Sequence, residues 1–414
     1  MNPLLPDMTK ATSLTRQGRL SEAMAILRQA LSAGGSPSAP ADCDRDVAQG
    51  RSGCAPPIRD VVLPSTATGA TWTLPQSDKT HPSGPPPSMS GQHFPGALRA
   101  FLGRMGDHVP RPDGFKRPGV LRAPAPLPKG ARFEERTYAN AAGSRAYKLY
   151  VPSGYKGQAL PLVVMLHGCT QSPDDFAAGT RMNDLAEEET FLVAYPAQSQ
   201  AANISKCWNW FNAGDQQRDQ GEPSLIAGIT RQIMRDFPVD RRRVYIAGLS
   251  AGGAAAAIMG ATYPDLYTAV GVHSGLACGV AHDVPSAFAA MRQGGGRRHG
   301  QPSRTVPTIV FHGDRDTTVN PVNGDQVIAQ SKAAGDLRTT VSRGEAQGGI
   351  GYTRTIQADP TGRPMLEQWT LHGAGHAWSG GSASGSYTDP RGPDASRAMM
   401  RFFLQHPAAD AAVC

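Results

Sequence analysis

The chain has no long apolar run. Among its 414 residues, no segment approaches the roughly 20 consecutive apolar residues that a membrane-spanning helix requires. The N-terminus also lacks a charged stretch followed by an apolar run and a small-residue cleavage site, so it predicts no standard secretory signal. We therefore expect no transmembrane segment and, on this ground alone, a soluble cytoplasmic protein.

Cysteine is scarce and follows no metal-binding pattern. The six cysteines form no C-x-x-C pair and no Cys/His spacing typical of zinc, so a metal site is not expected. Cys43, Cys54 and Cys414 lie outside the segments that carry chemistry. Cys169 and Cys207 flank such segments, and whether they form a disulfide depends on the redox compartment.

Charge of one sign is in modest excess. Lys and Arg number 41 against 34 Asp and Glu, which gives a net charge of +7. The basic residues are scattered, and no DNA- or RNA-binding signature accompanies them. We interpret the chain as a mildly basic protein without a nucleic-acid partner.

The 35 prolines and 47 glycines are unevenly distributed and mark the domain boundaries. Residues 1–34 hold an amphipathic helical pattern over 8–33 that ends at a Gly pair. Residues 35–128 are rich in Pro, Gly and Ser without apolar periodicity, which predicts a disordered, flexible linker. Residues 129–406 form the predicted catalytic domain, and 407–414 a tail.

Short buried strands alternate with helices in the ordered part. Two alternating segments, 133–139 and 144–151, flank an Asn-Ala-Ala-Gly turn and predict an antiparallel hairpin. Almost wholly apolar runs, typical of strands buried on both faces of a parallel sheet, cover 161–167, 191–196, 243–250, 269–275 and 308–313. Helical patterns cover about 173–188, 223–237, 251–263, 321–335 and 393–405. The alternation predicts an α/β fold with a doubly wound, mostly parallel sheet.

Residues 248–252, Gly-Leu-Ser-Ala-Gly, fit the pattern G-x-S-x-G. They stand between an apolar strand pattern and a small-residue helix pattern, where a nucleophilic serine occupies a sharp strand-to-helix turn. The two glycines leave room for that crowded turn. The helix N-terminus also directs N–H groups toward the anion formed in the reaction. We predict that Ser250 is a nucleophile.

A serine nucleophile needs a base that is oriented by an acid, and here the chain order is Ser, acid, His. The run 308–313 ends in a loop with two acids, Asp314 and Asp316, at the sheet edge where open α/β sheets place their sites. Asp316 better matches the usual position of the acid. Asp314 is expected to stabilise the turn through its own hydrogen bonds.

The predicted base is His376, in the Gly-flanked loop LHGAGHAWSGG after the last strand. His372 lies on that strand, and we expect it to be a packed or surface residue. His312 and His273 lie at strand ends and are assigned structural roles.

Two backbone N–H groups are expected to bind the oxyanion. One belongs to Ala251, directly after the nucleophile, and the other to Cys169, in the loop after the run 161–167. Aromatic side chains cluster nearby in the sequence CWNWF. Candidate walls of a substrate pocket are Trp208, Trp210 and Trp378, with core packing beneath a loop as the alternative.

Five motifs in a fixed order carry a resemblance to a known family: LHGCTQ, CWNWF, GLSAGG, HGDRDTTV and GHAWSGG. Together they resemble the poly(3-hydroxybutyrate) depolymerase family of esterases, which is related to the feruloyl and acetylxylan esterases of carbohydrate esterase family one. The resemblance covers roughly residues 130–406. It implies an α/β-hydrolase fold and ester hydrolysis without metal or cofactor. The positions that match the family's triad and oxyanion hole are Ser250, Asp316, His376, Cys169 and Ala251.

The resemblance implies a serine esterase that hydrolyses polyhydroxyalkanoate-type (3-hydroxybutyrate) or other short-chain esters. Small or oligomeric esters, with polyester among them, are the expected partners, and no oligomeric state is predicted. Secreted depolymerases of this kind typically carry a signal peptide and a polymer-binding domain. Because the chain shows neither, we expect oligomers, amorphous polymer or small esters as substrates, although the family implies an extracellular protein. The alternatives are a feruloyl or acetylxylan-type carbohydrate esterase and a catalytically silent hydrolase-fold binding protein.

Overall fold

The computed structural model describes residues 126–296 and 305–408. The predicted helix over 8–33, nearly all of the predicted linker over 35–128 and most of the predicted tail over 407–414 lie outside these residues. Three of the six cysteines lie outside them as well.

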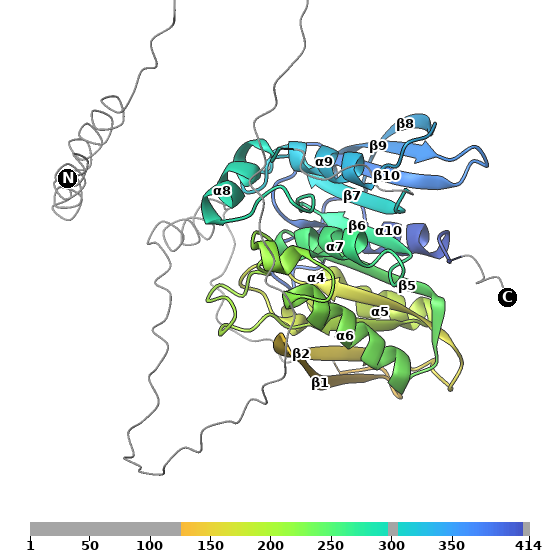
Figure 1. The fold of residues 1–414 in the computed structure, drawn as a ribbon. Helices are drawn as coiled ribbons and strands as arrows, with labels where there is room; N and C mark the ends of the chain where they lie inside the picture. Colours follow the sequence, from red (N-terminus) through yellow and green to blue (C-terminus); the bar gives the residue numbers. More distant parts are fainter. Residues whose placement is uncertain (1–125, 297–304, 409–414) are drawn as a thin grey trace, which may run out of the picture. The chain divides into compact units, whose positions relative to one another are not determined.

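In the described part of the chain, ten strands form one sheet in the order β1-β2-β4-β3-β5-β6-β7-β10-β9-β8 (Figure 1). The strands are β1 (Arg132–Asn140), β2 (Gly143–Val151), β3 (Leu160–Leu166), β4 (Leu192–Pro196), β5 (Val239–Leu249), β6 (Ala269–His273), β7 (Thr308–Gly313), β8 (Arg338–Glu345), β9 (Gly351–Ala358) and β10 (Pro364–Leu371). The run from β4 to β10 is parallel throughout. Antiparallel pairs complete both edges.

The central strands are buried along their whole length. Every residue of β3, β4, β6 and β7 is buried. Parallel strands covered by helices on both faces need apolar side chains at every position, which is why these strands read as continuous apolar runs. The predicted hairpin is also present, with Asn140 paired to Gly143 across its turn.

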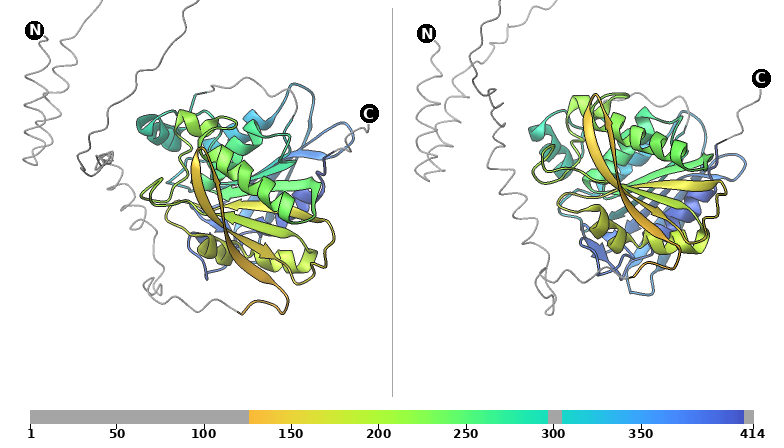
Figure 2. Two further views of the ribbon diagram at one scale, coloured as in Figure 1. Left: turned by 60° about the horizontal axis from the view of Figure 1, so that its bottom comes forward. Right: turned by 90° about the horizontal axis from the view of Figure 1, so that it is seen from below.

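Helices cover both faces of the sheet. They are α4 (Pro173–Thr180), α5 (Met182–Glu189), α6 (Gly221–Asp236), α7 (Ala251–Thr262), α8 (Val284–Gln293), α9 (Val322–Ser331) and α10 (Ala395–Leu404). The apolar sides of α6, α7, α8 and α9 pack in one core layer, and those of α4, α5 and α10 in a second (Figure 2). The predicted doubly wound α/β-hydrolase architecture is confirmed. No helix in the described residues is long and apolar enough to cross a membrane.

Three regions differ from the sequence-based expectation. The helix expected over 173–188 is divided at Arg181, whose φ of 55° ends α4 and begins α5. Helix α8 and the hairpin of β8 and β9 were not predicted. Nearly all of β8 is exposed, so its polar sequence carries no alternating apolar signal.

Candidate active site

Ser250 occupies the turn between β5 and α7. Its backbone has φ 57° and ψ −120°, a conformation that residues other than glycine rarely adopt. The Ser250 N–H donates to the carbonyl of His273 at 2.9 Å, which ties the turn to the neighbouring strand β6. Strain of this kind persists where the surrounding structure enforces it, and it is typical of functional sites.

The glycines on either side of Ser250 are required by contact. A Cβ atom at Gly252 would lie 2.0 Å from the carbonyl oxygen of Leu166, and one at Gly248 would lie 2.3 Å from the carbonyl oxygen of Gly252. Backbone atoms cannot move away as a flexible side chain can. The pattern G-x-S-x-G therefore follows from the packing of α7 against β3 and β5.

Asp316 and His376 come together from two different loops. Asp316 follows β7 and His376 follows β10, and the two strands are parallel neighbours. The distance from His376 Nδ1 to Asp316 Oδ2 is 2.7 Å. The other carboxylate oxygen accepts the backbone N–H groups of Thr318 and Val319, each at 2.9 Å. The carboxylate is thus fixed on both sides, and it orients the imidazole ring.

Burial, nearby charge and hydrogen bonds have opposing effects on the pKa of the Asp316 carboxyl. Burial by itself raises its pKa, but the charge of His376 and hydrogen bonds from His312 and His376 outweigh burial and hold the pKa well below its usual range. The group therefore stays ionised and accepts the Nδ1–H of His376. That tautomer leaves Nε2 free to act as a base.

Asp314 has a different partner. Its carboxylate accepts the backbone N–H of Gly373 at 2.7 Å and lies 3.1 Å from Nδ1 of His372. The structure thus brings Asp316 to His376 and Asp314 to His372. Asp314 connects the loop after β7 to the loop after β10, rather than bonding only within its own turn.

The remaining strand-end histidines are buried beneath the site. His312 Nε2 lies 2.8 Å from the carbonyl of Val319 and 3.5 Å from Asp316 Oδ2. His273 Nε2 accepts the N–H of Ser379 at 3.0 Å. Burial, together with the nearby His312 and His376, lowers the pKa of His273 to about 3, so this ring is neutral.

Ser250 and His376 line one pocket. The other lining residues are Gly168, Cys169, Thr170, Gln171, Leu249 and Tyr387. Within the described residues, no hydrogen bond uses the backbone N–H of Cys169 or of Ala251, the two predicted oxyanion donors. Ala251 is the first residue of α7, where a helix N–H has no partner within the helix.

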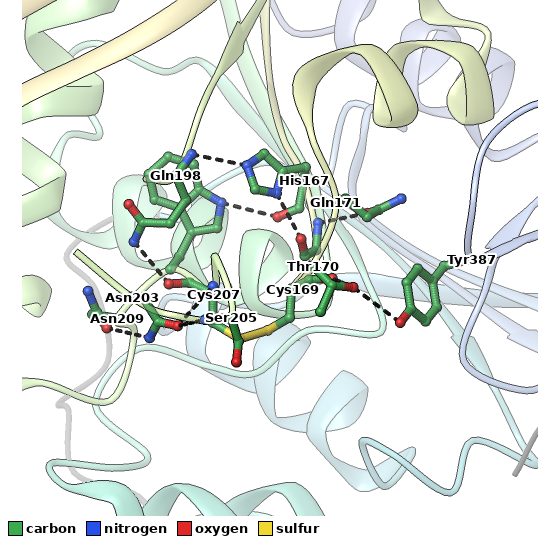
Figure 3. The surroundings of a disulfide bond; sticks show 12 residues. His167, Cys169, Thr170, Gln171, Gln198, Asn203, Ser205, Cys207, Asn209 and Tyr387 are labelled. Atoms are coloured by element: carbon green, nitrogen blue, oxygen red, sulfur yellow. Dashed lines mark hydrogen bonds between the residues drawn. A yellow bond between two sulfur atoms is a disulfide. The ribbon is translucent and has the colours of Figure 1, made fainter. Parts of the chain in front are cut away.

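A disulfide joins Cys169 to Cys207, across a sequence separation of 38. The sequence left this pairing open. Beside it, the Thr170 N–H donates to the carbonyl of Ser205 at 2.7 Å. Figure 3 shows the loop around Cys169 joined to the segment 198–207 by the disulfide and by the hydrogen bond from the Gln198 N–H to His167. The loop that carries the predicted Cys169 donor is therefore anchored covalently.

The three tryptophans proposed as pocket walls lie in the core layers. Trp208 is fully buried and donates its ring N–H to the carbonyl of His167 at 3.1 Å. Trp378 is also buried, and its ring N–H donates to Ser396 Oγ at 3.1 Å. Trp210 is 7% exposed. The pocket that contains Ser250 is lined instead by Tyr387, which sequence reasoning missed because no motif singles it out.

No group of three or more His, Cys, Asp or Glu side chains in the described part of the chain is arranged to hold a metal ion. What the site offers is a strained serine hydroxyl, an imidazole oriented by a buried carboxylate, and two unoccupied N–H donors. Acyl transfer by nucleophilic catalysis requires groups of these kinds.

The sheet order, the strand-to-helix serine and the Asp–His pair at the carboxyl ends of parallel strands place the chain in the α/β-hydrolase class. A family model described as esterase PHB depolymerase matches residues 145–348. This match supports the family assignment that the ordered motifs predict.

Individual proteins agree with this assignment. Poly(3-hydroxyalkanoate) depolymerase C of Paucimonas lemoignei is 32% identical over 55% of this chain and 57% of its own length. Feruloyl esterase B of Thermothelomyces thermophilus is 28% identical over 55% of this chain and 82% of its own. The solved acetyl xylan esterase of Aspergillus awamori shares the fold, with a TM-score of 0.52 and 20% identity over 66% of this chain and 99% of its own. The match thus spans little more than half of the Paucimonas relative.

Proposed function

We propose that this chain is a serine esterase whose catalytic unit lies within residues 129–406. The observation that carries the proposal is that Ser250 lines one pocket with His376, which is itself bonded to the buried Asp316. No single sequence segment contains all three groups. Their convergence at the carboxyl ends of β5, β7 and β10 supports one shared chemical role.

In the proposed mechanism, Nε2 of His376 takes the hydroxyl proton of Ser250 as the serine oxygen attacks the ester carbonyl. Asp316 remains ionised and stabilises the imidazolium that forms. The N–H groups of Cys169 and Ala251 donate to the oxyanion. His376 then protonates the leaving alcohol, and water releases the acyl group by the same steps in reverse order.

The proposed substrates are polyhydroxyalkanoate-type esters, such as 3-hydroxybutyrate oligomers, or other short-chain esters. The depolymerase relative, which has the higher identity of the two curated relatives compared above, supports this choice. The feruloyl esterase relative and the acetyl xylan esterase fold keep a carbohydrate esterase as the second candidate. A catalytically silent binding protein is the remaining alternative.

The test is hydrolysis of p-nitrophenyl butyrate, hydroxybutyrate oligomers and methyl ferulate by the wild type and Ser250→Ala. We expect the variant to lose roughly 10³–10⁶-fold in turnover, because the nucleophile is removed while the fold is retained. Near-normal activity of the folded variant would contradict the proposed nucleophile. Hydrolysis of the ferulate ester alone would favour the carbohydrate esterase. No hydrolysis, together with no labelling of Ser250 by a fluorophosphonate probe, would favour the binding protein.

A further inference from the structure

Backbone strain is concentrated around the pocket. In the described part of the chain, eight residues other than glycine have positive φ angles. Three of them line the pocket: Thr170 (φ 67°), Ser250 (φ 57°) and Tyr387 (φ 53°). The strand-to-helix turn accounts for Ser250. It does not account for Thr170, a β-branched residue for which positive φ is a genuine outlier, or for Tyr387.

The backbone around Thr170 is held in place by two links to the segment 205–207. Its N–H donates to the carbonyl of Ser205 at 2.7 Å, and the preceding residue is joined by the disulfide to Cys207. Its side chain is exposed, yet its conformation is enforced by these links. The hydroxyl therefore has a fixed position at the pocket.

Tyr387 is held from both sides as well. Its carbonyl accepts the N–H of Trp378 at 2.7 Å. The preceding residue, Ser386, donates its N–H to Asp175 at 2.9 Å, and Asp175 in turn accepts from the side chain of the buried Gln171 at 2.9 Å. This network joins the loop that carries Tyr387 to the loop that carries Thr170, so the two side chains are fixed relative to one another.

The direction of the hydrogen bonds follows from simple chemistry. Thr170 Oγ1 lies 2.6 Å from the carbonyl oxygen of Cys169, which can only accept, so the threonine proton donates there. The Tyr387 hydroxyl lies 3.3 Å from the same Oγ1 and therefore donates its own proton to Thr170 (Figure 3). With its proton engaged, the Tyr387 oxygen presents lone pairs. Its complement is a hydrogen-bond donor on the bound molecule.

We propose that Tyr387, oriented by Thr170, is a specificity-determining residue that accepts a hydrogen bond from a hydroxyl group of the ester substrate. The inference rests on the proposed esterase function. The hydroxyl has two sources: the acyl part, as in a 3-hydroxyacyl ester, or the alcohol part, as in a monoacylated polyol. In either case Tyr387 raises kcat/KM for the hydroxylated ester over its unhydroxylated analogue.

The experiment compares matched substrate pairs. One pair is p-nitrophenyl 3-hydroxybutyrate and p-nitrophenyl butyrate, and the other is glycerol monoacetate and propyl acetate. Tyr387→Phe keeps the ring and removes only the hydroxyl. In one pair we expect the variant's kcat/KM ratio, hydroxylated to unhydroxylated, to fall about 3- to 10-fold, as loss of one neutral hydrogen bond predicts.

Tyr155→Phe is the matched control. Tyr155 follows β2 at the edge where the parallel strands begin, opposite the pocket, and packs on Phe237 with ring centroids 5.9 Å apart. Both of its ratios should equal those of the wild type. The thermal midpoint of each variant confirms that the fold is retained.

The outcomes separate the two claims. A fall in the first pair places the hydroxyl on the acyl part, and a fall in the second places it on the alcohol part. Wild-type ratios of Tyr387→Phe in both pairs would overturn the inference while leaving the esterase function intact. No hydrolysis of any of these esters by the wild type would instead overturn the esterase function itself.

Discussion

Removal of the Cys169–Cys207 disulfide should weaken both the stability and the catalysis of this protein. The perturbation is Cys207→Ala, which breaks the link and leaves the backbone of Cys169 in place. The link spans a separation of 38 residues. Loop-closure entropy for a loop of that size is about 13 cal/mol/K, which is about 4 kcal/mol of unfolding free energy at 25 °C. The thermal midpoint should fall by on the order of 10 °C.

The effect on catalysis has a separate cause. The disulfide anchors the loop whose Cys169 N–H is the proposed oxyanion donor, and without it hydrogen bonds alone, such as that from Thr170 to Ser205, hold that loop near the opposite segment. A more mobile donor stabilises the transition state less. We expect kcat to fall about 10-fold, short of the roughly 10²–10³-fold cost of deleting a donor.

Thermal unfolding and kcat on p-nitrophenyl butyrate are measured with and without dithiothreitol. The reductant should reproduce both losses in the wild type and change nothing further in Cys207→Ala. Cys278, the one cysteine of the described residues outside the disulfide, is buried, and burial raises its pKa to about 12, so it should not react. A Cys207→Ala variant with wild-type stability and kcat would refute the reasoning.

Two further predictions concern charge. Asp316→Asn should lower kcat by roughly 10³–10⁴-fold, because it favours the wrong His376 tautomer, whereas its neighbour control Asp314→Asn should lose less than about 10-fold. Equal losses in the two variants would contradict the assignment. Burial lowers the pKa of His167 to about 4 and that of His273 to about 3, below their unfolded value near 6.5. The contribution of the two neutral rings to the free energy of unfolding is therefore fully present above about pH 6.5. It is lost as the pH falls toward 4 for His167 and toward 3 for His273, by on the order of 3 kcal/mol or more for each ring. Denaturant unfolding between pH 4 and 7 measures the loss, and unchanged or rising stability toward pH 4 would disprove it.

Much of the fold could be predicted because its signals are local. The apolar runs of β3, β4, β6 and β7 stand out since both faces of each strand are covered. Ser250 stands out because Gly248 and Gly252 are demanded by contacts with backbone atoms. The hairpin of β8 and β9 gave no such signal, because nearly all residues of β8 are exposed and its sequence shows no alternation of apolar and polar residues.

By itself, the sequence determined the strand-helix alternation, the strained serine turn and the chain order of Ser250, Asp316 and His376. Only the tertiary structure decided that Asp316 contacts His376 while Asp314 contacts His372, because two residues of spacing cannot reveal which partner each carboxylate reaches. It alone placed Tyr387 beside Thr170, 217 residues away in the chain. Contacts at such separations depend on how whole layers pack, and no local pattern of residues encodes them.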